Sequence, residues 1–155
     1  MDEAMVEICH EKGLEAVQED ALTYLERLPA GTLDGAFASH VIEHMRSEEM
    51  IALVRAAANA LEPGAALVLE TPNPECLAAL ASFSIDFSHV RLYHPEAMKW
   101  LLEQQGFEDV AIDYASGVEL PPGTEPRDEL AADPLRSLLF GYQEYAVAGR
   151  KRVAA

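Results

Sequence analysis

The stretch from Leu33 to Met45 most constrains what this chain can fold into. It begins with an apolar run of strand length and continues at once into clustered polar groups, before a helical pattern follows. Such a run is typical of a buried strand, and in open α/β sheets ligands bind at the carboxyl ends of strands. The polar side chains after the run are therefore candidates for a functional site, although a helix surface could also carry them: Ser39, His40, Glu43 and His44.

The rest of the chain alternates helical and extended patterns. Periodicity, capping residues and Pro or Gly stops predict helices that begin after Asp2, after Asp20, with Ser47 as cap, near Glu75 and at Pro95. Strands are expected at 14–17, 33–38, 65–71 and 107–114, with a last one within 135–148, and 116–128 is expected to be a loop. This alternation predicts a three-layer α/β sheet that ends in an antiparallel C-terminal hairpin.

Composition limits the classes of function. The 155 residues suffice for one domain, 1–155, and the net charge of −16 argues against a nucleic-acid binder, because phosphates need Lys and Arg. No window approaches the ~20 apolar residues of a membrane span, and the acidic start is unlike a secretory leader. Cys9 and Cys76 lack metal-type spacing, which predicts reduced thiols in a cytoplasmic protein. The one basic cluster, 150–152, is expected to solubilise a terminus.

One motif suggests a different chemistry. His40-Val41-Ile42-Glu43-His44 matches the H-x-x-E-H pattern of inverted zinc peptidases, in which two histidines on one helix bind Zn²⁺ and the glutamate activates water. That pattern belongs in mid-helix, whereas here His40 directly follows a strand and the helix is expected near Ser47. Zinc hydrolysis is therefore the weakest of three hypotheses, and no metal site is assigned.

Two further groups of polar residues complete the candidates. Asp20 and Asn73 also follow strand-like runs, so they should converge with Ser39, His40, Glu43 and His44 at one sheet edge, unless each is a local cap or turn former. The segment 85–94 is rich in polar and aromatic groups. It could be a solvated lid, or it could hold a polar or sugar-like substrate beside the aromatic rings of Phe87 and Tyr93, through Asp86, His89, Arg91 and His94.

Several segments, in order, resemble a known family. They run from Met5-Val6-Glu7-Ile8-Cys9 through Asp20-Ala21-Leu22 and Ile42-Glu43-His44 to Leu61-Glu62-Pro63-Gly64. Over roughly residues 1–115 the chain resembles class I S-adenosylmethionine-dependent methyltransferases of the type 11 kind, which have a Rossmann-like sheet. Later pieces, 71–74, 89–95 and 106–107, resemble the branch that modifies glycans and other envelope metabolites.

The resemblance implies roles for individual residues. Asp20 matches the acidic position that contacts the adenine amino group, with a backbone contact from Ala21, and Ser39 and His40 match positions that flank the methionine portion of the cofactor. His40 or His44 could take the acceptor's proton. The remaining candidates are assigned to the acceptor: Glu43, Asn73, His89, Arg91 and His94.

The chain also departs from the family pattern. Family members begin with a strand and a glycine-rich loop, whereas no Gly-x-Gly occurs here and the resemblance begins after the second strand. The expectation is an N-terminally truncated sheet with unpaired edges beside 14–17. Either 14–17 pairs directly with the strand at Leu33, or a second copy forms a homodimer, or a partner completes the sheet.

The expected function follows from the resemblance and from the departure. It is methyl transfer from S-adenosylmethionine to a small-molecule or glycan-type acceptor, impaired by the absence of the glycine-rich loop. The alternative is a non-catalytic methyltransferase-like interaction module. No nucleic-acid or membrane partner is expected.

Overall fold

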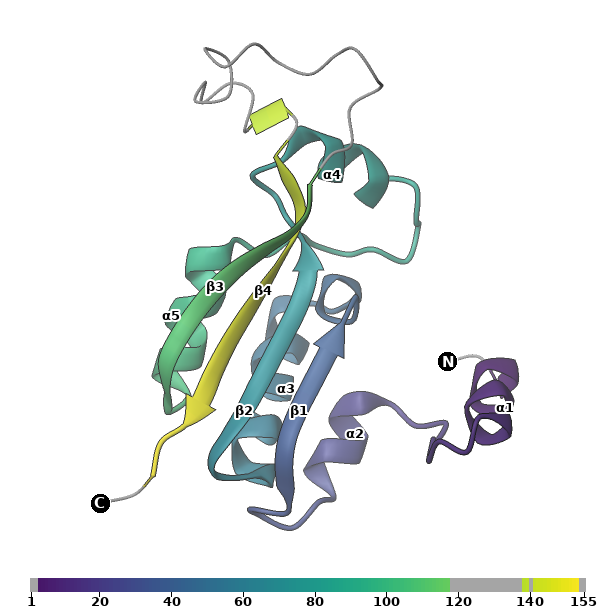
Figure 1. Ribbon diagram of the computed structural model, residues 1–155, viewed down its shortest axis with the longest axis vertical. Helices are drawn as coiled ribbons and strands as arrows, with labels where there is room; N and C mark the ends of the chain where they lie inside the picture. Colours follow the sequence, from purple (N-terminus) through teal and green to yellow (C-terminus); the bar gives the residue numbers. More distant parts are fainter. Residues whose placement is uncertain (1–2, 118–137, 140, 154–155) are drawn as a thin grey trace.

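The computed structural model describes residues 3–117, 138, 139 and 141–153, which form a mixed four-stranded sheet with helices (Figure 1). The strands are β1 (Leu33–Ser39), β2 (Leu61–Pro72), β3 (Phe107–Gly117) and β4 (Tyr142–Lys151), in the order β1-β2-β4-β3. The pair β1 and β2 is parallel, whereas β4 runs antiparallel to both β2 and β3. The predicted α/β class with an antiparallel end is confirmed.

The helices begin and end largely where local signals place them. They are α1 (Glu3–Glu11), α2 (Ala21–Glu26), α3 (Ser47–Ala60), α4 (Leu77–Phe83) and α5 (Pro95–Gln104), with a 3-10 turn, η1, at Ile42–His44. Gly13 and Gly106 follow α1 and α5 and have φ of 73° and 89°. Residues with a Cβ rarely adopt this left-handed backbone conformation, so glycine is favoured at both positions. The predicted cap Ser47 is wrong by one residue, because Arg46 is the cap and its backbone N–H donates to Glu49. Asp2 and most of the predicted loop 116–128 lie outside the described residues.

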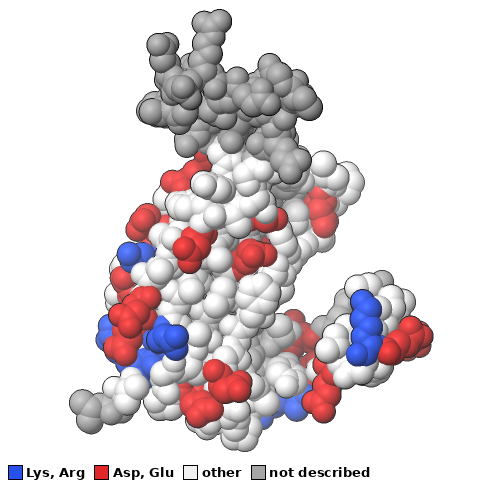
Figure 2. Space-filling model, in the orientation of Figure 1, with Lys and Arg blue, Asp and Glu red and all other residues white. Residues whose placement is uncertain are grey.

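The core lies between the sheet and the helices α3 and α5, which stand behind the sheet in Figure 1. Alternate residues of the central strands point to this face and are buried: Leu67, Leu69, Tyr145 and Val147. Their neighbours on the opposite face are only half-buried and mostly small. Figure 2 views that opposite face, where a largely uncharged band runs along the sheet between acidic groups.

The predicted strand at 14–17 is wrong. These residues form no strand, and the side chains of Leu14 and Val17 are 57% and 58% exposed. A strand is stable only when a neighbouring strand satisfies its backbone hydrogen bonds, and no described strand lies beside this segment. Direct pairing with β1 is thereby excluded, and β1 remains an edge of the described sheet.

The end of β4 also differs from expectation. Instead of forming a solubilising tail, Arg150 donates to the Gly64 carbonyl and Lys151 to that of Leu61, where α3 gives way to β2. Cys9 and Cys76 are both free thiols, while the cytoplasmic location stays a prediction. None of the helices in the described ranges is long and apolar enough to cross a membrane.

Candidate active site

The site is built around a sharp turn at the carboxyl end of β1. The strand ends at Ser39, and the backbone of His40 then adopts φ of 52°, in the left-handed region that residues with a Cβ rarely occupy. A hydrogen bond of 3.0 Å from the His40 N–H to the Glu70 carbonyl, at the end of β2, holds the turn. Strained backbone of this kind clusters at functional sites.

Carboxylates surround the His40 imidazole. Its Nδ1 lies 2.9 Å from Oε1 of Glu43 and its Nε2 lies 3.0 Å from Oε1 of Glu144. Glu70 completes the group, since its carboxylate accepts a 2.6 Å hydrogen bond from the Ser39 hydroxyl. Ser116 donates to Glu144 in turn. The ends of all four strands therefore contribute to one polar cluster.

Sequence reasoning missed three members of this cluster, Glu70, Glu144 and Ser116. Glu70 could have been found, because it is the acidic residue that closes the apolar run of β2. Glu144 offers no such signal, since it reaches the site only through the antiparallel register that sets it opposite Pro72. Long-range pairing of this kind has no local sequence signature.

Glu43 is fully buried and ties the site to the following loop. Oε2 of its carboxylate accepts a 3.0 Å hydrogen bond from the Thr71 hydroxyl. Its backbone carbonyl accepts from the N–H groups of Val90 and Arg91, at 2.8 and 3.1 Å. Because residues 42–44 form a single 3-10 turn and His40 precedes it, the two-histidine helix face of inverted zinc peptidases is absent from this segment.

Four of the predicted site residues line one open hollow of about 700 Å³. Asp20 and Ala21, at the start of α2, face His40 and His44 across it, and the apolar side chains of Val41 and Met45 also line it. Asp20 also stabilises the start of α2. Its Oδ1 caps α2 by accepting from the backbone N–H of Thr23 at 2.9 Å.

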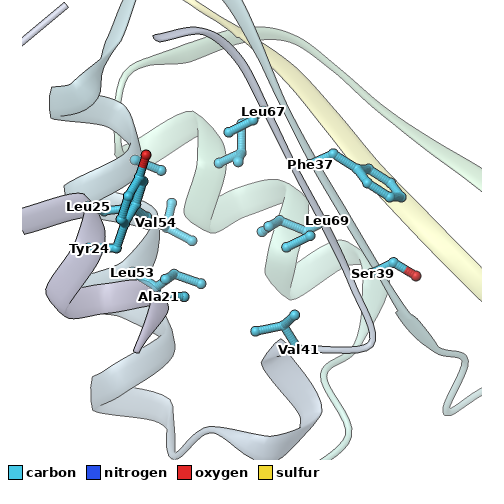
Figure 3. A pocket seen from close by; sticks show the side chains of 13 residues that line it. Ala21, Tyr24, Leu25, Phe37, Ser39, Val41, Leu53, Val54, Leu67 and Leu69 are labelled. Carbon is cyan, nitrogen blue, oxygen red and sulfur yellow. The ribbon is translucent and has the colours of Figure 1, made fainter. Parts of the chain in front are cut away.

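A second hollow, of about 400 Å³, lies between α2, α3 and β1 (Figure 3). Its lining is apolar and includes Tyr24, Val54 and Leu69. In Figure 3, Phe37 and Ser39 point to the opposite side of β1 from these residues. Ser39 thus faces Glu70 on the open face of the sheet, where Phe37 is 66% exposed.

None of the five predicted acceptor residues lines these two hollows. The Asn73 side chain donates to the Tyr142 carbonyl and accepts from the Glu75 N–H, so it forms the turn after β2. Arg91 donates to the hydroxyl of Ser47 at 2.8 Å, and His94 is the N-cap of α5.

Another acceptor candidate, His89, lines a third hollow, of about 320 Å³, together with His40 and Glu144. Its ring stacks on Phe83 and lies 4.7 Å, centroid to centroid, from the ring of His44. The nearby loop is ordered by hydrogen bonds from the Ser88 side chain and N–H to Asp86, which hold the pKa of that carboxyl below its usual range.

Comparison with known proteins gives a consistent result. A family model described as a methyltransferase domain matches residues 3–112. The structure of a SAM-dependent methyltransferase from Archaeoglobus fulgidus is 32% identical; the match covers 97% of this chain and 73% of that chain, with a TM-score of 0.85. No functionally curated protein matches the sequence.

More distant structures share the fold alone. A SAM-dependent methyltransferase from Thermotoga maritima, described as a possible histamine N-methyltransferase, is 15% identical, with 97% and 70% of the two chains covered and a TM-score of 0.71. Phosphoethanolamine N-methyltransferase 2 from Haemonchus contortus, in complex with S-adenosylmethionine, is also 15% identical, with 96% and 40% covered and a TM-score of 0.65.

Proposed function

Because this chain belongs to the methyltransferase domain family, whose cofactor is S-adenosylmethionine, we propose that it methylates a small-molecule or glycan-type acceptor beside His40. One observation carries the proposal: Asp20 and Ala21, at the start of α2, line a single hollow with His40 and His44, which follow β1. The resemblance of the sequence assigned cofactor or catalytic roles to the same four residues.

The residues around the hollow fit an adenosyl group. Asp20 retains hydrogen-bonding capacity beyond the two bonds from Thr23, since a carboxylate accepts about four, and it can accept from an exocyclic amine. Val41 and Met45 offer apolar surface for the base. The volume of about 700 Å³ falls within the range of small-ligand pockets.

Methyl transfer requires that the acceptor be aligned with the methyl group and that a base take the proton that the acceptor loses. The cofactor, when bound, supplies a methyl group on a positively charged sulfur. The carboxylates of Glu43, Glu70 and Glu144 favour positive charge at this end of the sheet. His40 can take the acceptor's proton as a neutral ring, with Nδ1–H donated to Glu43 and Nε2 turned to the acceptor in place of Glu144; His44 on the same hollow is the alternative base. Alignment of the acceptor provides most of the remaining rate enhancement.

Thermal shift with S-adenosylhomocysteine tests the cofactor site. Asp20→Ser keeps a good helix cap but removes the carboxylate, so we expect its ligand-induced shift to disappear while its helix content is unchanged. Asp113→Ser, at an exposed position of β3, is the control that should behave like the unmodified chain. An undiminished shift in Asp20→Ser would show that Asp20 does not bind the cofactor.

A methyl-transfer assay on His40→Ala and His44→Ala then separates the two bases. Loss of rate in the His40 variant alone, at unchanged cofactor affinity, supports His40 as the proton acceptor. The reverse pattern assigns the proton to His44. Equal activity in both variants would contradict a histidine base.

A separate feature supports association through β1. This strand pairs only with β2 among the described strands, so its outer edge presents unpaired N–H and C=O groups. The apolar hollow lies beneath it, and Phe37 is exposed on its open face. We propose that a strand from a second copy, or from a partner protein, pairs with this edge and completes the sheet.

Light scattering over a range of concentrations tests this association. A homodimer should dissociate when Phe37→Lys adds a charge to the edge strand, whereas Lys99→Ala, on α5, should leave it intact. A monomer at all concentrations would exclude the homodimer and leave the partner protein. A dimer that gains no stability from the cofactor would favour the non-catalytic interaction module.

A further inference from the structure

A second polar cluster lies beside the site just described. Glu43, His44 and His89 each place one potential donor atom within 4.8 Å of the others. They come from two segments, η1 and the loop before α5, which the backbone hydrogen bonds to the Glu43 carbonyl join. Neither the methyl-transfer proposal nor the sequence motif uses this set of three.

The hydrogen bonds of His89 fix its tautomer. Its Nδ1 lies 2.8 Å from the Phe83 carbonyl oxygen, which can only accept, so Nδ1 carries the proton. In the neutral ring, Nε2 then has a free lone pair. Stacking on Phe83 restrains the ring plane. Metal-binding histidines are oriented in the same manner, by a carbonyl or carboxylate that accepts from the second nitrogen.

A short chain of hydrogen bonds also fixes the tautomer of His44. The Ser88 hydroxyl donates its single proton to Asp86, at 2.6 Å, and therefore accepts from the His44 Nδ1, which lies 3.0 Å away. This leaves the lone pair of His44 on Nε2. Two imidazoles, both held with the proton on Nδ1, thus lie in ring contact.

The carboxylate of Glu43 shares its nearest possible cation, the His40 ring, with Glu144. It is fully buried, and no lysine or arginine within the described ranges forms an ion pair with it. Its partners are the Thr71 hydroxyl and the His40 ring, and that ring is shared with Glu144. Buried carboxylates are usually paired with a positive charge or bound to a metal.

We propose that Glu43, His44 and His89 bind one divalent transition-metal ion, with Zn²⁺ as the best match. Two imidazoles and one carboxylate form a known protein ligand set for Zn²⁺, and this set leaves a coordination position open for water or for an acceptor oxygen. The donor atoms lie within 4.8 Å of one another, so a bound ion would draw them closer together, and His44 is the exposed member of the three. The proposed site does not require methyl transfer, and a bound ion would occupy the Nε2 lone pair of His44 and leave His40 as the base.

Cobalt binding by the full chain tests the proposal. After treatment with a chelator, the protein is titrated with Co²⁺. Visible absorption and, by calorimetry, the heat of binding are recorded, and Zn²⁺ is then added as competitor. We expect one equivalent of Co²⁺, displaced by Zn²⁺. His44→Ala and His89→Ala should each weaken binding by ~10-fold or more, and Ser88→Ala by ~10–100-fold through loss of the His44 contact.

Three controls keep the result decisive. His10→Ala, on α1, removes a histidine far from the cluster in sequence and should bind as tightly as the unmodified chain. Glu144→Gln changes the neighbouring group of His40, Glu70 and Glu144 but none of the three proposed ligands, so binding should survive it. Circular dichroism verifies that each variant is folded, and His44→Ala, at an exposed position, is the least disruptive.

Two outcomes would overturn the proposal. One is the absence of stoichiometric binding by the folded, unmodified chain. The other is binding that Glu144→Gln abolishes and His89→Ala leaves intact, which would assign the metal to the His40 group instead. Cofactor-induced thermal shift, measured on the same variants, reports separately on the methyltransferase proposal.

Discussion

The two edges of the sheet, β3 with β4 at one end and β1 at the other, differ sharply in how completely they are packed. On the side of β3 and β4, Phe107, Tyr145 and Val147 are fully buried against α5 and the neighbouring core. On the side of β1, Phe37 is two-thirds exposed, an apolar hollow lies under the strand, and α1 buries no residue. The helix-covered face of the sheet is thus filled beneath β4 and hollow beneath β1. The association through β1 proposed above would remove this difference.

The largest expected effect tests this contrast directly. Phe107→Ala should lower the free energy of unfolding by about 3–5 kcal/mol, because it leaves a cavity in the packed side. The same change at Phe37 should cost within about 0.5 kcal/mol at low concentration. Urea denaturation measures both. Equal losses would show that the β1 side is packed in solution, whereas a loss at Phe37 that grows with protein concentration would sharpen the case for association.

An intermediate effect is expected at the buried polar group between the two sides. Thr71→Val removes the hydroxyl that donates to the buried Glu43, and the unfolding free energy should fall by about 1–3 kcal/mol. Thr32→Val, in the exposed turn before β1, is the matched control and should change it by about 0.5 kcal/mol or less. A neutral result at Thr71 would mean that Glu43 finds another donor.

The smallest effect concerns alkaline stability on the packed side. Burial raises the pKa of Tyr145, whose hydroxyl donates to the Tyr93 carbonyl. The folded state therefore holds the proton more tightly than the unfolded state, and this stabilisation is present below a tyrosine's ordinary pKa of about 10 and is lost as the pH rises above it.

Tyr145→Phe should cost about 1 kcal/mol at neutral pH, through the lost hydrogen bond, and should flatten the decline of stability towards about pH 11. Denaturation curves across that range measure the slope. An unchanged slope would assign the alkaline sensitivity to other groups.

Much of the fold could be predicted because its signals are local. Pro95 at a helix start, Gly106 after the same helix and the apolar run of β2 each act within a few residues, and the structure places the elements accordingly. The error at 14–17 has the opposite origin. Four extended-looking residues become a strand only beside a neighbouring strand, and the described structure places none there.

The candidate site shows the same difference between local signals and long-range contacts. The sequence by itself determined that polar residues follow β1 and that Asp20 begins a helix, since both depend on neighbours in the chain. Only the tertiary structure decided that His40 meets Glu144, 104 residues away, and that His44 meets His89. Strand register and loop placement bring these pairs together, because hydrogen bonding between distant segments is satisfied globally and leaves no periodic trace in the sequence.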